Sequence, residues 1–120
     1  MNKAQNAKPI YDLEERTRRF SSNIMVFCKT LPFSIENNEV RKQLIRSACS
    51  VGANYIEANE SLSKKDFIMR IKICRKEAKE TQYWLYLLHN SINIEEKVTT
   101  LLQEARELTK IFGSILTKSS

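Results

Sequence analysis

The stretch "RSACSVGANYIEAN", residues 46–59, combines small side chains with a helical pattern of apolar positions. Its only formal charges are Arg46 and Glu57, and it contains one of the two glycines of the chain. On a helical wheel of about 100° per residue, the apolar residues in and just before the stretch form two adjacent seams. The first seam is Val40, Leu44, Ala48, Val51 and Tyr55, and the second is Ile45, Cys49, Gly52 and Ile56.

Two apolar seams on one helix predict neighbours on two sides, because a surface helix of a monomeric bundle needs only one apolar face. Glycine in a helix interior costs about 1 kcal/mol relative to alanine. Gly52 therefore predicts the close approach of another backbone. We take Gly52 and Ile56 as candidate contacts to another subunit.

Four segments with helical periodicity predict an all-α protein. Pro32 ends the first segment, and Ser63 with Asp66 three residues later marks the start of the third. The predicted helices span residues 12–31, 36–59, 63–90 and 94–117. Because the connections are short, we expect residues 11–118 to form an up-down-up-down antiparallel four-helix bundle, preceded by a flexible N-terminal arm of residues 1–10.

The composition argues against several classes of protein. A chain of 120 residues suits one domain. No apolar run approaches the ~18 residues of a membrane span, and no signal-peptide core is present, so we expect a cytoplasmic protein without membrane contact. The cysteines are far apart and there is one histidine, which predicts reduced thiols and no metal site, cofactor or catalytic residue. These residues are Cys28, Cys49, Cys74 and His89.

The third predicted helix carries apolar residues outside its core seam. The core seam is Phe67, Ile71, Cys74, Ala78, Leu85 and Leu88. A second group would form an exposed patch rich in aromatic residues, which usually marks an interface. Its members, Met69, Ile73, Trp84 and Leu87, are therefore further candidate subunit contacts. Alternatively, the N-terminal arm folds over this patch.

Positive charge is concentrated in the same helix. The formal net charge of the chain is +6, and residues 63–90 include seven basic residues and three acids. A basic stripe ending in an aromatic residue suits a phosphate backbone, although lysines that only promote solubility would give the same pattern. The candidate nucleic-acid-binding residues are Lys65, Lys72, Arg75, Lys76, Lys79 and Tyr83.

Antiparallel pairing of the second and third helices sets Arg46 level with Glu77 and Glu80. We predict a charge-assisted hydrogen bond from Arg46 to one of these acids, with a structural role. Asn54 and Glu57 complete the predicted polar cluster. Since basic residues that could neutralise the two acids surround them, we expect no enzyme here.

Two stretches carry residues at distinctive spacing: "QLIRSACSVGANYIEA" (43–58) and "SKKDFIMRIKICRKEAKETQYWLYLL" (63–88). The positions that carry a family resemblance are Arg46-Ser47, Ala53-Asn54, Glu57-Ala58, Ser63, Asp66-Phe67, Glu77-Ala78, Glu80 and Trp84-Leu85. From about Leu13 to Phe112 the chain resembles the four-helix-bundle proteins encoded within intervening sequences of bacterial 23S ribosomal RNA genes. The resemblance implies a ring-like homopentamer of undefined activity. Proteins of similar fold are accessory subunits of diversity-generating retroelements, where they bind reverse transcriptase and nucleic acid.

Together these patterns predict a non-enzymatic homo-oligomer that binds RNA, DNA or a ribonucleoprotein through a basic surface. Repeated around a ring, the stripe would form a multivalent cationic surface. The alternative is a protein–protein interaction scaffold with no nucleic-acid role, whose partner could be a nucleic-acid enzyme. Whether the purified protein carries nucleic acid would distinguish the two.

Overall fold

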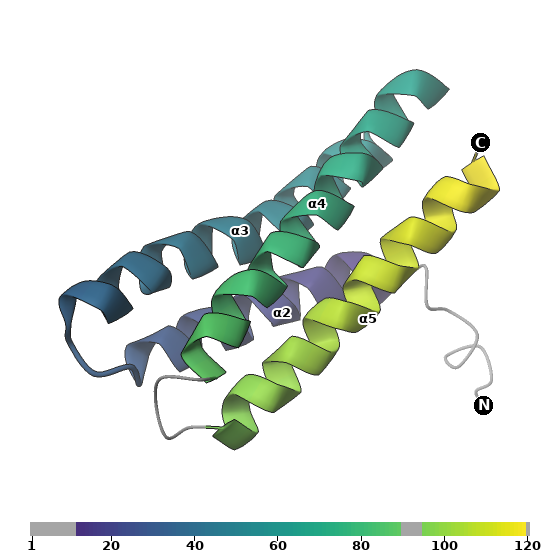
Figure 1. Ribbon diagram of the computed structural model, residues 1–120. Coiled ribbons are helices and arrows are strands. Elements are labelled where there is room, and N and C mark those ends of the chain that lie inside the picture. Colours follow the sequence, from purple (N-terminus) through teal and green to yellow (C-terminus); the bar gives the residue numbers. More distant parts are fainter. Residues whose placement is uncertain (1–11, 90–94, 120) are drawn as a thin grey trace, which may run out of the picture.

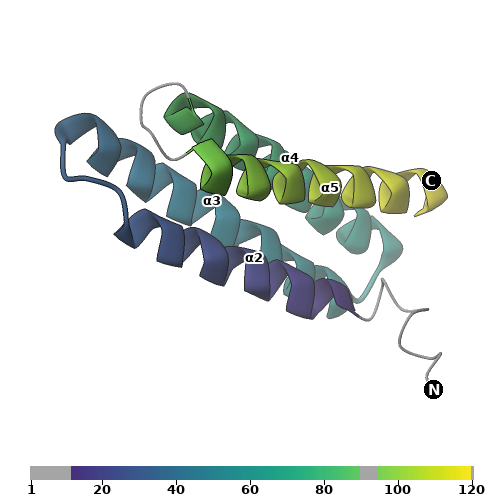
Figure 2. The same cartoon turned by 90° about the horizontal axis from the view of Figure 1, so that it is seen from below.

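The computed structural model describes residues 12–89 and 95–119, and these form four α-helices without a β-strand (Figures 1 and 2). The all-α prediction is therefore confirmed. The observed helix ends lie within two residues of the predicted ones. The predicted arm of residues 1–10, the predicted helix end at residue 90 and the predicted helix start at residue 94 lie outside the described residues. The helices are α2 (Asp12–Lys29), α3 (Ile35–Asn59), α4 (Lys64–His89) and α5 (Glu95–Ser119).

Side-chain caps explain where three of these helices begin or end. The Ser34 and Ser63 hydroxyls accept hydrogen bonds from the backbone N–H groups of Asn37 and Asp66, each at 3.0 Å, and so cap the first turns of α3 and α4. At the end of α2, the Arg41 guanidinium donates to the carbonyl oxygen of Cys28. This bond satisfies one of the carbonyls that a helix C-terminus leaves unpaired.

Most of the first predicted seam of α3 and of the core seam of α4 is buried between the helices, whereas in the second seam of α3 Ile45 and Cys49 are half-buried and Ile56 is exposed. α3 packs against both α2 and α4, and α5 packs mainly against α4, so the side between α2 and α5 is the most open (Figure 2). The Tyr55 and Phe112 rings meet in this core with centroids 6.0 Å apart. The largest fully buried side chains include Leu13, Phe20, Ile24, Leu44, Val51, Ile71, Leu85, Leu88, Val98, Leu108 and Phe112.

Gly52 faces α2 of the same chain. A Cβ atom added at Gly52 would lie 3.2 Å from Thr17 Oγ1 and 3.4 Å from Thr17 Cβ. The predicted close approach of another helix is therefore present. The prediction that Gly52 contacts another subunit is wrong, because Gly52 is buried inside the single chain.

None of the helices that the structure describes is long and apolar enough to cross a membrane.

Candidate functional site

The outer face of α4 carries all six predicted nucleic-acid-binding residues. Each of them is exposed, and the opposite side of the helix is buried through Ile71, Cys74 and Ala78. At about 1.5 Å rise per residue, the face extends about 27 Å from Lys65 to Tyr83. We call the exposed residues Lys65, Lys72, Arg75, Lys76, Lys79 and Tyr83 the α4 face.

Positive charge on the α4 face is largely uncompensated. Lys76 Nζ lies 3.9 Å from the Glu77 carboxylate at the edge of the face. The other four cations have no carboxylate of the described residues within ion-pair distance. Arg16 and Arg46, which link neighbouring helices, are each paired with two carboxylates. The α4 face is therefore a surface that attracts anions.

A hollow of about 510 Å³ lies at the N-terminal end of the α4 face. Three lysines and two apolar residues line it, namely Lys64, Lys65, Ile68, Met69 and Lys72. Met69 is 52% exposed there. Burying Met69 against another subunit would require these lysines to be neutralised or kept hydrated, which disfavours Met69 as a subunit contact.

Two tyrosines lie exposed at the other end of α4. Tyr83 is 56% and Tyr86 is 55% exposed. The Tyr83 ring packs edge-on against Trp84 at 4.9 Å between centroids, and the Tyr86 ring is parallel to His89 at 6.4 Å. Tyr86 is not among the residues predicted from sequence, although its position three residues after Tyr83 places it on nearly the same side of the helix.

The remaining candidate subunit contacts are exposed to different degrees. Ile56 is 48% and Leu87 is 38% exposed, whereas Ile73 and Trp84 are half-buried. Apolar surface of this kind is available for a partner, and the contact itself stays a prediction.

Arg46 bridges α3 and α4 as predicted. Its Nη1 donates to Glu77 Oε1 at 3.3 Å, and its Nη2 donates to Glu80 Oε2. Trp84 Nε1 also donates to Glu80 Oε2, at 2.9 Å. Burial raises the pKa of Glu80, but the hydrogen bonds from Trp84 and Arg46 and the positive charge of Arg46 outweigh it, so the pKa lies below its ordinary value. Each charge of this group has a partner of opposite sign, and its predicted structural role stays a prediction.

The predicted polar cluster is in fact divided. Asn54 lies two helical turns beyond Arg46 on α3, where its Oδ1 accepts a hydrogen bond from Arg70 at 2.9 Å. Glu57 is exposed, and its backbone carbonyl accepts a hydrogen bond from Ser61. The prediction of one cluster is wrong for Asn54 and Glu57, because the α3–α4 pairing gives Asn54 its own partner and turns Glu57 to solvent.

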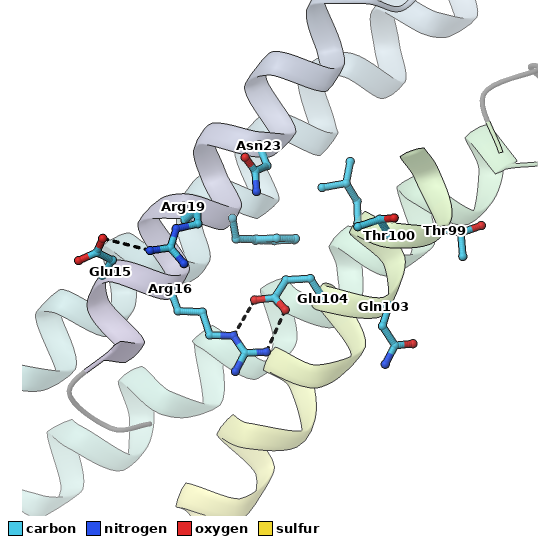
Figure 3. Close-up of a pocket in the computed structure, with 10 residues that line it drawn as sticks. Glu15, Arg16, Arg19, Asn23, Thr99, Thr100, Gln103 and Glu104 are labelled. Atoms are coloured by element: carbon cyan, nitrogen blue, oxygen red, sulfur yellow. Dashed lines mark hydrogen bonds and ion pairs between the residues drawn. The ribbon is translucent and has the colours of Figure 1, made fainter. Parts of the chain in front are cut away.

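A groove of about 900 Å³ lies between α2 and α5, and polar side chains that include Arg16, Asn23 and Glu104 line it (Figure 3). Arg16 donates two hydrogen bonds to the Glu104 carboxylate, at 2.7 and 2.9 Å, and a third to Glu107. Its neighbour Arg19 pairs with Glu15 at 3.1 Å. Because these charges are matched within the groove, it holds less unbalanced charge than the α4 face.

The groove was missed by sequence reasoning. Glu104 and Glu107 are three residues apart on α5 and therefore lie on one side of the helix, which predicts a basic residue on the neighbouring helix. That signal does not identify Arg16 of α2 as the partner, and it does not indicate that α2 and α5 diverge.

The cysteines offer no reactive thiolate in the core. Burial raises the pKa of Cys28 to about 11 and that of Cys74 to about 12, and Cys49 is half-buried. Within residues 12–89 and 95–119, no group of three or more His, Cys, Asp or Glu residues could hold a metal ion.

Comparison with known proteins identifies the relatives of this four-helix chain. Residues 11–114 match the family described as 23S rRNA-intervening sequence protein. The chain belongs to this family. No curated protein matches the sequence.

This 23S rRNA-intervening sequence protein is also similar to a solved structure. That structure is a protein of unknown function from the S23 ribosomal protein family of Bacteroides thetaiotaomicron. The two share 33% sequence identity, with 86% of this chain and 96% of the other covered and a TM-score of 0.75. The predicted family resemblance is thus confirmed.

Proposed function

We propose that this protein is a non-enzymatic, cytoplasmic homo-oligomer that binds RNA, alone or in a ribonucleoprotein, through the α4 face. The observation that carries the proposal is the line of exposed cations Lys65, Lys72, Arg75 and Lys79, which have no described carboxylate within ion-pair distance.

Counterion release supplies the binding free energy in this proposal. A phosphate backbone carries condensed counterions, and each lysine that neutralises a phosphate releases them. The net charge of +6 favours approach of any polyanion, and the α4 face determines where it binds. Binding through phosphates alone is independent of nucleotide sequence.

Assembly of several subunits would place several α4 faces on one particle. We propose that the up-down-up-down bundle is the subunit of a ring-like homopentamer, with Ile56, Ile73, Trp84 and Leu87 at the subunit contact. Several α4 faces on one particle raise the effective concentration of lysines near a bound strand. Weak binding by each subunit could then give useful affinity for the whole assembly.

The first test replaces the lysines of the α4 face. We expect the quadruple variant Lys65→Gln, Lys72→Gln, Lys76→Gln and Lys79→Gln to bind a fluorescein-labelled RNA at least about tenfold more weakly at low ionic strength. Fluorescence anisotropy measures the affinity, and circular dichroism checks that helicity is unchanged.

A second variant of equal charge serves as the control. It carries Arg18→Gln, Lys29→Gln, Lys97→Gln and Lys110→Gln, all at exposed positions away from α4. We expect it to retain most of the affinity. Equal losses in both variants would show that net charge, and not the α4 face, governs binding. No binding by the wild type at low ionic strength would reject the nucleic-acid proposal.

The second candidate function is a protein–protein scaffold, and the α2–α5 groove favours it. Its matched charges suit a polypeptide better than a polyanion, and its polar side chains, among them Asn23, Thr100 and Gln103, offer hydrogen-bonding groups. This function replaces the first if the wild type binds no nucleic acid. In that case Thr100→Trp, which would fill the groove, should abolish binding of the protein partner.

A further inference from the structure

We propose that the nucleic acid recognised by the α4 face is single-stranded, and that its bases contact apolar and aromatic side chains of α4. This inference rests on the proposed function, and it adds a distinction between single strands and duplexes that charge alone does not make.

The hollow at the start of α4 offers two kinds of contact close together. Lys64, Lys65 and Lys72 can bind phosphates, while Ile68 and Met69 offer apolar surface between them. A duplex presents phosphates but keeps the faces of its bases stacked inside. A single strand presents phosphates and base faces together, which is what this lining can contact.

Beyond Lys79, the last lysine of α4, the helix presents two exposed aromatic rings. Tyr83 lies one helical turn after Lys79, and Tyr86 lies nearly another turn beyond. Both rings are more than half exposed, and Tyr86 is held parallel to His89. Exposed rings that continue a cationic surface are the usual stacking platforms of proteins that bind single strands, and here the rings follow the lysines of the α4 face.

The two halves lie along one path on the helix. Met69 and Tyr83 are separated by about 21 Å at 1.5 Å rise per residue, with Lys72, Lys76 and Lys79 between them. The two acids between Lys72 and Tyr83, Glu77 and Glu80, are both paired with Arg46 of α3. A strand lying along α4 would therefore meet apolar surface, then cations, then aromatic rings, with little electrostatic repulsion.

The test compares one RNA of about 20 nucleotides as a single strand and as a blunt duplex. Charge alone favours the duplex, because its charge density is higher. We expect the wild type to bind the single strand at least about fivefold more tightly. The double variant Tyr83→Ala, Tyr86→Ala should lose about fivefold or more in affinity for the single strand and keep its duplex affinity.

Two matched variants and a mass measurement complete the experiment. Tyr83→Phe with Tyr86→Phe keeps both rings and should bind like the wild type. Phe33→Ala removes an aromatic residue that is 89% exposed on the loop between α2 and α3, and it should change nothing. Light scattering should give the same mass for all variants.

The outcomes separate the inference from the proposed function. The single-strand inference is overturned if the wild type binds the duplex as tightly as the single strand or more tightly. It is also overturned if the alanine variant loses equal affinity for both ligands. Either result leaves the proposed function standing. A lower mass for the alanine variant would also overturn it, because the tyrosines would then act in assembly. No binding of either ligand would reject the proposed function itself.

Discussion

At the scale of single residues, the two glycines differ in the side chain that an added Cβ atom would contact. Gly52 faces Thr17, whose Oγ1 would be 3.2 Å from an added Cβ. Gly113 faces Arg75, whose Nε would be 3.4 Å away and belongs to a flexible side chain. The first contact is between two packed helices, whereas the second can adjust by movement of a long side chain.

We therefore expect opposite effects of substitution at these positions. Gly52→Leu should lower the free energy of unfolding by about 1–3 kcal/mol, because the core has no room for it. Gly113→Ala should raise it by up to about 1 kcal/mol through helix propensity. Urea denaturation measures both. A Gly52→Leu variant with wild-type stability and a smaller oligomeric mass would contradict the intrachain assignment.

At the scale of helices, polar contacts fix the pairing of α3 with α4. The Thr81 hydroxyl donates to Ser47 Oγ at 2.8 Å in the core, with both side chains fully buried. Arg46 pairs with Glu77 and Glu80 on one side of this contact. Because buried polar groups need partners, sliding α3 along α4 would leave several of them unsatisfied.

The Arg46 contact makes stability depend on pH. Arg46→Met should destabilise the protein by about 1–2 kcal/mol near pH 7, since it leaves the Glu77 and Glu80 carboxylates without their cation. The folded-state pKa of Glu80 is lowered, so its contribution is complete above the unfolded pKa of about 4.3 and is lost as the pH falls through the lower folded-state pKa.

Urea unfolding of both proteins at about pH 7 and about pH 3 tests this dependence. The difference between wild type and Arg46→Met should shrink at the lower pH. Arg46→Lys, which keeps the charge, should lie between the two proteins. An equal difference at both pH values would show that Arg46 acts through packing and not through its charge.

The faces of the helices could be predicted from sequence because side-chain spacing determines them directly. Leu13, Phe20 and Ile24 recur at helical spacing, and all three are buried. The spacing of side chains along one helix does not determine the angle at which two helices cross. The glycine at position 52 therefore indicated a close neighbour without identifying it as α2, and the groove between α2 and α5 could not be foreseen. The cations of the α4 face were predictable, because exposure follows once the core face is known.

At the scale of the whole molecule, the apolar surface of α4 predicts self-association. The chain mass is 14.0 kDa, and we expect light scattering to give a multiple of it. Ile73→Glu with Leu87→Glu should lower that mass, because charges would be buried at the contact. Leu62→Glu, at a fully exposed position between α3 and α4, is the control and should leave it unchanged. A wild-type mass of one chain at micromolar concentration would reject the homo-oligomer.

The salt dependence of RNA binding tests the central claim, that the α4 face is an electrostatic site for nucleic acid, most directly. Between about 50 and 200 mM salt, log K should fall linearly with log salt concentration for the wild type. Removing the four lysines of α4 should flatten that slope by about 3, because each phosphate of a single strand that a lysine neutralises contributes about 0.7 to it. The control variant of equal charge should keep the wild-type slope. Identical slopes for all three proteins would contradict the claim.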